Sequence, residues 1–579
     1  MTEHRIRAGV IRELLMGLHG RLDPHGVRVR GARIVGKLDL DYIDTAFGLD
    51  LLGCAVTEPI TARGAHLARL VLTASHIGSL DANGLRLDGG MELVRVRLIG
   101  HNAKIWLYDA SIGGVLNCRQ LHADQLDGPV VSADRLRVGS NLLLEGARIT
   151  SSGEEGAVRL PGAHIGGQFN ATGMRVDNSA GPALFADRLQ VDASMFLANA
   201  RITGSGEKGA VRLPGAHIGG GLNAMGMHVD NSAGPTLFAD ALQVDDDIFL
   251  EGARITSSSE KGAVRLLGAH IGGQFNATGM HVDNSAGPAL LADNLQVDAS
   301  MFVQDAHFTG SRRHDALGLR LARIGGRLVF TGTRILNGAA KGIDLEDAQV
   351  DGPVFFPARI VCLQPWGHSC PSSHLVGLDG FRFNELAQTD WRRWLHLIRF
   401  HTAYYSPSPY QQLAAVERAA GHDSNARHIL IAQQQDLHRF APEELGGRLT
   451  RSFHQLWGLL GGYGYRARRT AAALLFALAA AGGLGLWAGH VETNPGYAAE
   501  RTTASGSPGQ QCSPVELIGL GLDRGLPFAP TGLRARCDLD TATTSGQTFT
   551  VAVWFIQAAI WGLATLALAG YTGLIRKPA

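Results

Sequence analysis

The stretch GAVRLPGAHIGG occupies residues 156–167 and returns unchanged at residues 209–220. A third copy at residues 262–273 differs only by Leu in place of Pro, and neighbouring copies are 53 residues apart. The triplet Ile-Gly-Gly keeps the same phase through five units, at Ile112, Ile165, Ile218, Ile271 and Ile324. A register held over five units without an insertion indicates structural units that stack rigidly on one another.

A shorter word recurs inside each unit. Its copies place a small residue, a polar residue and an aliphatic residue in order, as in Gly146-Ala-Arg-Ile, Asn199-Ala-Arg-Ile and Ala186-Asp-Arg-Leu. In a coiling chain the aliphatic residues would fill the interior as short strands, while Asp, Asn and Gly serve the turns. We therefore predict a mainly β fold, a parallel β-helix, in which each unit makes about three coils of about 18 residues.

A leucine-rich repeat is the competing interpretation. Its L-x-x-L-x-L-x-x-N ladder is missing, and segments such as Val176-Asp-Asn-Ser-Ala-Gly-Pro would break its helical return. The repeat words instead resemble those of the pentapeptide-repeat and related bacterial solenoids, which implies a β-solenoid.

Helical segments are expected on both sides of the solenoid. Residues 3–19 carry apolar residues at helical spacing, which predicts an amphipathic helix that covers the first coil. These residues are Ile6, Val10, Ile11, Leu14, Leu15 and Leu18. After Ala358 the repeat words stop, and residues 385–401, 408–420 and 423–439 are predicted to be helices, the last two forming a helical hairpin.

Two uncharged stretches near the C-terminus, 471–491 and 549–575, are each long enough to cross a bilayer. Arg466, Arg468 and Arg469 precede the first stretch, and Arg576 and Lys577 follow the second. By the positive-inside rule we expect a multi-pass protein of the cell membrane with both termini in the cytoplasm. The charged N-terminal segment has no apolar core, so we expect no secretory signal peptide.

These patterns divide the chain into six predicted segments. They are a cap helix (1–20), a solenoid (21–360), a linker and helical module (361–470), a first transmembrane helix (471–491), an extracytoplasmic loop (492–547) and a second transmembrane helix (548–575).

The predicted extracytoplasmic loop holds two cysteines, Cys512 and Cys537, in a compartment where a disulfide can persist. We therefore predict a bridge between them. Cys54, Cys118, Cys362 and Cys370 would then lie in the cytoplasm as reduced thiols.

The C-terminal part carries a second resemblance. YQQLAAVERAAGHDSNARHILIA at 410–432, GGYGYR at 461–466 and LAGYTGLIR at 568–576 resemble the membrane module attached to many bacterial pentapeptide-type solenoids. Some chains of that group are labelled membrane-associated oxidoreductases, so the resemblance implies that activity as one alternative.

A redox enzyme needs a cofactor or a redox pair, and the sequence shows no motif for either. The nearest dinucleotide-like pattern, GLGLDRG at 519–525, has the wrong spacing and no βαβ context. Cys362, His368, Cys370 and His374 fall within thirteen residues and are weak candidates for a metal site, because their spacing matches no common zinc motif. We predict no catalytic residue and no cofactor.

Two further sets of residues repeat at the unit period. His164, His217 and His270 share one phase, and Asn170, Asn223 and Asn276 share another. Each set would form a ladder on one face, either as a ligand surface or as turn residues copied by duplication. Asp187, Asp240 and Asp293 are expected to accept hydrogen bonds from turn amides.

The charge balance argues against nucleic acid as a partner, because 53 Lys and Arg face 52 Asp and Glu. The sequence favours a membrane-anchored cytoplasmic scaffold, which contacts the lipid bilayer and an unknown protein partner on a solenoid face. A channel or sensor is the other alternative. Gly462-Tyr-Gly-Tyr looks like a potassium filter but precedes the first span, and the only re-entrant candidate is residues 515–522.

Overall fold

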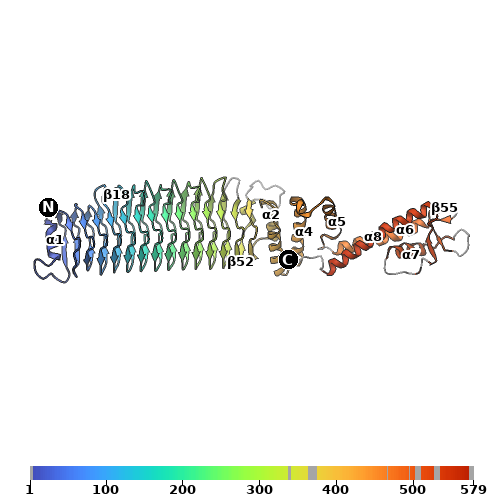
Figure 1. Cartoon of the computed structure of the whole chain (residues 1–579), viewed down its shortest axis with the longest axis horizontal. Helices are drawn as coiled ribbons and strands as arrows, with labels where there is room; N and C mark the ends of the chain where they lie inside the picture. The colour runs from blue at the N-terminus through green and yellow to red at the C-terminus, as the bar shows by residue number, and fades with distance from the viewer. Residues whose placement is uncertain are drawn as a thin grey trace. The chain divides into compact units, whose positions relative to one another are not determined.

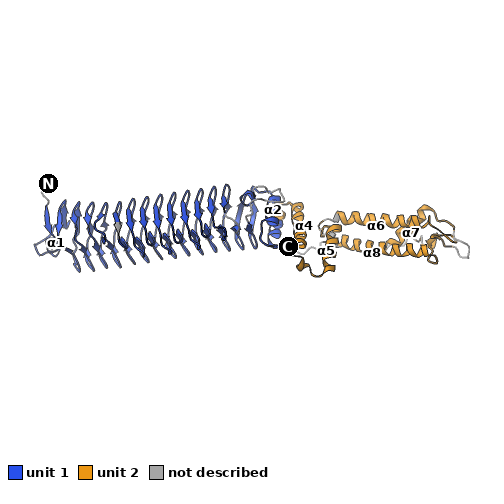
Figure 2. Ribbon diagram, turned by 90° about the horizontal axis from the view of Figure 1, so that it is seen from above, with its two compact units in different colours: residues 1–416 blue, residues 417–579 orange. Residues whose placement is uncertain are grey.

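The computed structural model describes residues 4–336, 341–362, 375–463, 465, 467–494, 496–502, 510–526, 532 and 535–572. The chain divides into two compact units, residues 1–416 and 417–579 (Figure 2). Each unit is described by itself.

The first unit is a parallel β-solenoid, as the repeat predicts (Figure 1). A typical coil consists of four short strands: β22 (Arg148–Ser151), β23 (Val158–Arg159), β24 (His164–Ile165) and β25 (Phe169–Asn170). Strands at the same place in successive coils pair in parallel, so four ladders run along the solenoid.

The four ladders form three sheets. Sheet A has 14 strands, from β1 (Arg5–Arg7) to β50 (Arg334–Leu336), and sheet C has 14 strands, from β4 (Leu38–Asp39) to β53 (Leu375–Gly377). Sheet B has 26 strands and holds the other two ladders. These two are joined where β52 (Gln349–Phe355) pairs with both β48 (Arg323–Ile324) and β49 (Leu328–Val329).

The expectation of three coils per unit is wrong. His164 of β24 lies opposite Gln190, and Gln190 lies opposite His217, so the coils are 26 and 27 residues long and two of them make one 53-residue repeat. Coils near the N-terminus are shorter, with Ile77 lying opposite Leu98.

A loop at one corner explains the longer coils. Residues 152–157 separate β22 from β23, whereas only residues 78–79 separate β10 (His76–Ile77) from β11 (Leu80–Asp81). A buried asparagine holds this loop: Nδ2 of Asn178 donates to the carbonyl oxygens of Gly153 (2.8 Å) and Pro182 (2.6 Å). Asn231 and Asn284 make the same pair of bonds in later coils.

One turn position illustrates that the sequence period covers two coils. Gly162 and Gly215 adopt a left-handed φ of 62° there, and in the coils that follow them Arg188 and Ala241 adopt φ 54°. Glycine takes this conformation without steric cost, and other residues take it with some strain. Alternate coils therefore keep different residues at the same turn.

The interior consists of aliphatic side chains stacked in register. Ile165, Val191, Ile218 and Val244 follow one another along sheet B, each at most 1% exposed. Since neighbouring strands in a sheet lie about 4.8 Å apart, every inward side chain contacts the equivalent residues before and after it.

Helix α1 (Ala8–Leu15) lies against the first coils and is shorter than predicted. It buries Ala8, Ile11 and Leu15 and contacts β2 (Val27–Arg30) and β4. Ile6 belongs instead to β1, opposite Ile34 of β3 (Arg33–Val35), and Val10 and Leu18 are exposed. The helix is short because residues 5–7 extend sheet A by one strand.

The solenoid continues beyond the predicted boundary at residue 360. Strands β53 and β54 (Arg382–Leu386) add to sheets C and B after the 3-10 helix η1 (Ala358–Ile360). Helix α2 (Trp391–Phe400) then buries Trp394, whose ring meets those of Phe356 and Phe383 at 5.3 and 5.7 Å between centroids. Helix α3 (Ser408–Ala419) follows.

The second unit is mainly helical. Its elements are α4 (Asp423–Phe440), η2 (Pro442–Leu445), α5 (Arg448–Gly461), α6 (Ala467–Ala488), β55 (Glu492–Thr493), β56 (Gly496–Tyr497), β57 (Ala499–Arg501), α7 (Pro514–Gly525), β58 (Cys537–Leu539) and α8 (Thr544–Thr572). Helices α6 and α8 contain the two stretches long and apolar enough to cross a membrane, 468–488 and 544–568. Large apolar side chains such as Phe476 (77% exposed) and Phe555 (75%) lie on their surfaces, which is unlike the core helix of a soluble protein.

Deleting Gly209 to Lys261 removes two whole coils and joins Lys208 to Gly262 in register. Because each coil contacts only its neighbours, we expect a folded, shorter protein that keeps its cooperative thermal unfolding, measured by far-UV circular dichroism. Deleting 209–248 instead should abolish folding, since inward and outward residues would exchange faces. Equal tolerance of both deletions would contradict the stacking described here.

Candidate functional site

The predicted histidine ladder lies on the outer face of sheet B. His164, His217 and His270 alternate along it with glutamines, and each histidine contacts an aspartate one coil further on. The contacts are His164–Asp192 (2.9 Å), His217–Asp245 (3.1 Å) and His270–Asp298 (3.0 Å). The His164 hydrogen bond lowers the pKa of the Asp192 carboxyl.

The asparagine set has a local structural role. Oδ1 of Asn170 accepts the backbone N–H of Thr172 (3.0 Å), and its Nδ2 donates to Oε1 of Glu145 (2.9 Å). Asn223 and Asn276 accept the equivalent N–H bonds from the residues two positions later. These bonds satisfy turn amides, which favours duplicated turn residues over a ligand surface.

The corner aspartates behave in two ways. Asp240 and Asp293 accept backbone N–H bonds from Leu267 (3.2 Å) and Arg320 (3.1 Å), as predicted. Asp187 instead binds the guanidinium of Arg212, whose Nε lies 3.0 Å away.

Arginines on sheet C are neutralised. Arg159, Arg212 and Arg265 stack alternately with Phe185 and Phe238, with guanidinium-to-ring distances of 4.9–5.2 Å. Each of these arginines also pairs with an aspartate of the preceding coil. The positive charges of this row of side chains are therefore balanced within sheet C.

A row of basic residues on sheet A differs from the paired arginines of sheet C. One outward position of this sheet is basic in nearly every coil, and we call this set the basic ladder. Its members, in order of pairing with one interruption at Ala55, are Arg5, Arg33, His76, Arg97, His122, Arg148, Arg175, Arg201, His228, Arg254, His281, His307 and Arg334.

Several ladder arginines have no anionic partner in the part of the chain that the structure describes. Arg175, Arg201 and Arg254 are exposed, and no described carboxylate lies within ion-pair distance of them. Like charges opposite one another on neighbouring strands destabilise a sheet. The formal net charge of +1 for the whole chain gives no sign of this row of basic residues.

A buried ionic cluster, which sequence reasoning missed, lies near the C-terminal end of the solenoid. Nζ of Lys341 lies 2.9 Å from Asp344 and 2.5 Å from Glu346, and the Tyr404 hydroxyl donates to Glu346 (3.2 Å). Burial disfavours the Lys341 charge, but its hydrogen bonds to Glu346 and Asp344 outweigh this and raise its pKa. Burial, followed by the charge of Asp344, raises the pKa of Asp315.

The cavity beside this cluster is too small for a substrate. Lys341, Glu346 and Tyr404 border a space of about 10 Å³, about the volume that admits one water molecule. The cluster therefore serves as a neutralising network between the last coils and the segment after α2.

Of the four predicted metal candidates, only Cys362 belongs to the described residues; His368, Cys370 and His374 lie outside them. Cys362 is buried and disulfide-bonded, so the expectation that it is a reduced thiol is wrong for this structure. Its Sγ lies 3.7 Å from Nε2 of His396, a residue of α2 that the sequence analysis did not select. The sequence did offer one signal for these ligands, because His396 and His401 both fall in the helix predicted at 385–401.

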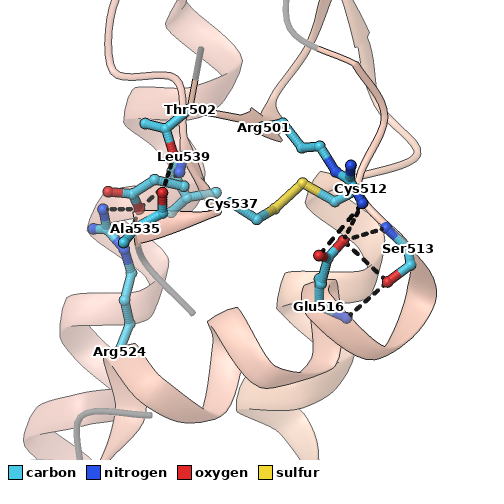
Figure 3. The surroundings of a disulfide bond; sticks show 10 residues. Arg501, Thr502, Cys512, Ser513, Glu516, Arg524, Ala535, Cys537 and Leu539 are labelled. Atoms are coloured by element: carbon cyan, nitrogen blue, oxygen red, sulfur yellow. Dashed lines mark hydrogen bonds and ion pairs between the residues drawn. A yellow bond between two sulfur atoms is a disulfide. The ribbon is translucent and has the colours of Figure 1, made fainter. Parts of the chain in front are cut away.

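In the second unit, Cys512 and Cys537 are joined in a disulfide with 6.3 Å between their Cα atoms (Figure 3). The bridge links the segment before α7 to β58. Nearby, the Ser513 hydroxyl accepts the backbone N–H of Glu516 (3.3 Å), and the Glu516 carboxylate pairs with Arg501 (3.3 Å).

The dinucleotide-like pattern at 519–525 lies within α7, where its glycines allow close helix packing. A Cβ on Gly521 would lie 2.0 Å from the carbonyl oxygen of Ala481 in α6. Residues 515–522, the re-entrant candidate, belong to the same helix.

No known family, curated protein or solved structure matches the chain.

His66 yields a test of pH dependence. Its Nε2 lies 3.0 Å from Asp88 and its Nδ1 2.9 Å from Asp44, and these hydrogen bonds, the one to Asp88 first, raise the pKa of His66. The pairing should stabilise the fold fully below about pH 6.5, the unfolded pKa, and progressively less as pH rises through the folded pKa.

Asp88→Asn should therefore lower the unfolding temperature at acidic pH and have little effect at alkaline pH. Thermal melts of both proteins across this range measure the difference. In a His66→Gln background, the effect of Asp88→Asn on the unfolding temperature should no longer depend on pH. If Asp88→Asn lowers the unfolding temperature of the wild type equally at every pH, His66 is not the titrating group.

Proposed function

We propose that the chain is a membrane-anchored scaffold whose solenoid binds an acidic protein partner through the basic ladder. Helices α6 and α8 span the membrane, and both termini lie in the cytoplasm. The arginines at 466, 468 and 469 and the pair Arg576 and Lys577 support this orientation through the positive-inside rule. No catalytic step is part of the proposal.

The basic ladder is the observation that carries the proposal. Its side chains repeat about every 4.8 Å along the sheet, and no described carboxylate lies within ion-pair distance of Arg175, Arg201 or Arg254. A partner that places carboxylates along this line would relieve the repulsion and form charge-assisted, bidentate hydrogen bonds with the guanidinium groups.

The neighbouring outward position favours a protein over other anions. Beside the ladder, Asp177, Asp230 and Asp283 alternate with threonines along sheet A. A uniformly anionic bilayer or phosphate polymer would meet these aspartates as well. The ladder contains no Phe, Tyr or Trp residue, the large rings on which bases stack most strongly.

The ends of the solenoid support the scaffold role. We propose that α1 and α2 act as caps, because exposed coil ends would present apolar interior and unpaired strand edges. Helices α3 and α4 would form a hairpin that connects the solenoid to the membrane segments.

The test is photo-crosslinking of the full-length chain in intact cells. A photoreactive residue at exposed Thr203, next to Arg201, should give a discrete crosslinked adduct, whereas one at exposed Gln243 on sheet B should not. The triple variant Arg175→Glu, Arg201→Glu, Arg254→Glu should weaken the adduct about threefold or more, since each exposed charge pair contributes about 0.2–1 kcal/mol.

A matched control reverses three exposed arginines on sheet B, Arg86→Glu, Arg137→Glu and Arg323→Glu, and should leave the adduct intact. Equal loss in both triple variants, or an adduct that does not depend on the ladder, would contradict the proposal.

A further inference from the structure

Three metal-binding side chains converge where the solenoid ends. Sγ of Cys362 and ring nitrogens of His396 and His401 all lie within 4.8 Å of one another. They come from two separate segments: Cys362 follows η1, and the two histidines lie in and just after α2. Cys362 is 0% exposed and His401 is 3% exposed.

Local packing fixes both segments. The backbone N–H of Cys362 donates to Ala358 (2.9 Å), and that of His401 donates to Leu397 (2.9 Å). The carbonyl oxygen of His401 accepts the N–H of Val376 in β53 (2.7 Å). The donor atoms are therefore held on a rigid part of the fold, as a specific site requires.

The geometry suits a tetrahedral ion. Zinc binds thiolate and imidazole at about 2.0–2.3 Å, which places ligand atoms about 3.4–3.8 Å apart around a tetrahedron. The Cys362 Sγ to His396 Nε2 distance is 3.7 Å, and the rings of His396 and His401 lie 5.5 Å apart between centroids. Small rotations of the imidazoles would bring all three donors to one centre.

We propose that Cys362, His396 and His401 bind Zn²⁺ in the reduced protein, and that the disulfide of Cys362 is the alternative, metal-free state. A disulfide sulfur is not a thiolate, and the thiolate is the form that binds a metal. The two states therefore exclude each other, and the site responds to redox conditions.

The exchange balances with a dithiol reductant. One thiolate of the dithiol attacks the protein disulfide and forms a mixed disulfide, releasing one protein thiolate. The second thiolate attacks the mixed disulfide and releases the other, so the dithiol becomes a cyclic disulfide and the two protein thiolates take up the two protons that the dithiol lost. The Cys362 thiol then loses its proton to solvent as its sulfur binds Zn²⁺. Metal binding would fasten η1 to α2 and so stabilise the closed end of the solenoid.

The test uses the full-length protein in detergent, reduced with a phosphine that does not bind metal, and titrated with Co²⁺ as a spectroscopic probe for Zn²⁺. One equivalent of Co²⁺ should give the thiolate-to-cobalt charge-transfer band of a tetrahedral site, and Zn²⁺ should displace it. The unreduced protein should not give the band. Zn²⁺ should also raise the unfolding temperature of the reduced protein only.

Substitutions identify the ligands. Cys362→Ser should abolish the charge-transfer band. His396→Ala or His401→Ala should weaken Co²⁺ binding by more than about 10–100-fold, the loss expected when a residue that only supports a ligand is removed. His401→Cys keeps a metal-binding side chain at this position and should bind Co²⁺ again. That result would show that the alanine variant loses Co²⁺ because it lacks a ligand and not because it misfolds. Cys118→Ser, which removes a buried thiol elsewhere, is the matched control and should bind as the wild type does.

Three results would overturn the proposal. They are a charge-transfer band that persists in Cys362→Ser, a band unaffected by both histidine substitutions, and reduced wild type that binds no Co²⁺.

Discussion

The fold depends on parallel stacking of coils at one fixed spacing. Backbone hydrogen bonds between equivalent strands and the aliphatic stack through Ile165, Val191 and Ile218 hold successive coils in the same register. Any slip by one residue would turn the aliphatic residues outward, so the register is strongly specified. The same constraint makes every outward residue the neighbour of its equivalent in the next coil.

Surface chemistry follows from that constraint. On sheet C the stacking produces arginines alternating with phenylalanines and paired with aspartates, which is electrostatically satisfied. On sheet A it produces the basic ladder, where Arg175 and Arg201 lie opposite each other and Arg254 lies between two histidines, and no described carboxylate lies within ion-pair distance of these arginines. Duplication of a repeat therefore also repeats the charged side chains on its outer surface. The difference in charge balance between sheet C and sheet A is the physical basis of the proposed scaffold.

The sequence predicted the architecture better than the sites. The strict recurrence of Ile-Gly-Gly was enough to infer stacked units with aliphatic residues inside, because a repeat of that length must bury its apolar residues against its neighbours; Ile218, for example, is 0% exposed. The number of coils was wrong, because residues 152–157 add a loop that a buried Asn178 holds, and a side chain's burial cannot be read from the repeat alone. His396 and His401 were missed because they approach Cys362 only through the fold of η1 and α2.

The proposed membrane orientation underlies both the proposed partner and the proposed redox response of Cys362. Native thiols cannot report it, because Cys54 and Cys118 are buried. Exposed reporters can: Thr203→Cys on the solenoid and Thr541→Cys in the segment between β58 and α8. With a membrane-impermeant maleimide on intact cells, the account predicts labelling of Thr541→Cys, and labelling of Thr203→Cys only after permeabilisation. Labelling of Thr203→Cys on intact cells would place the solenoid outside and contradict the account.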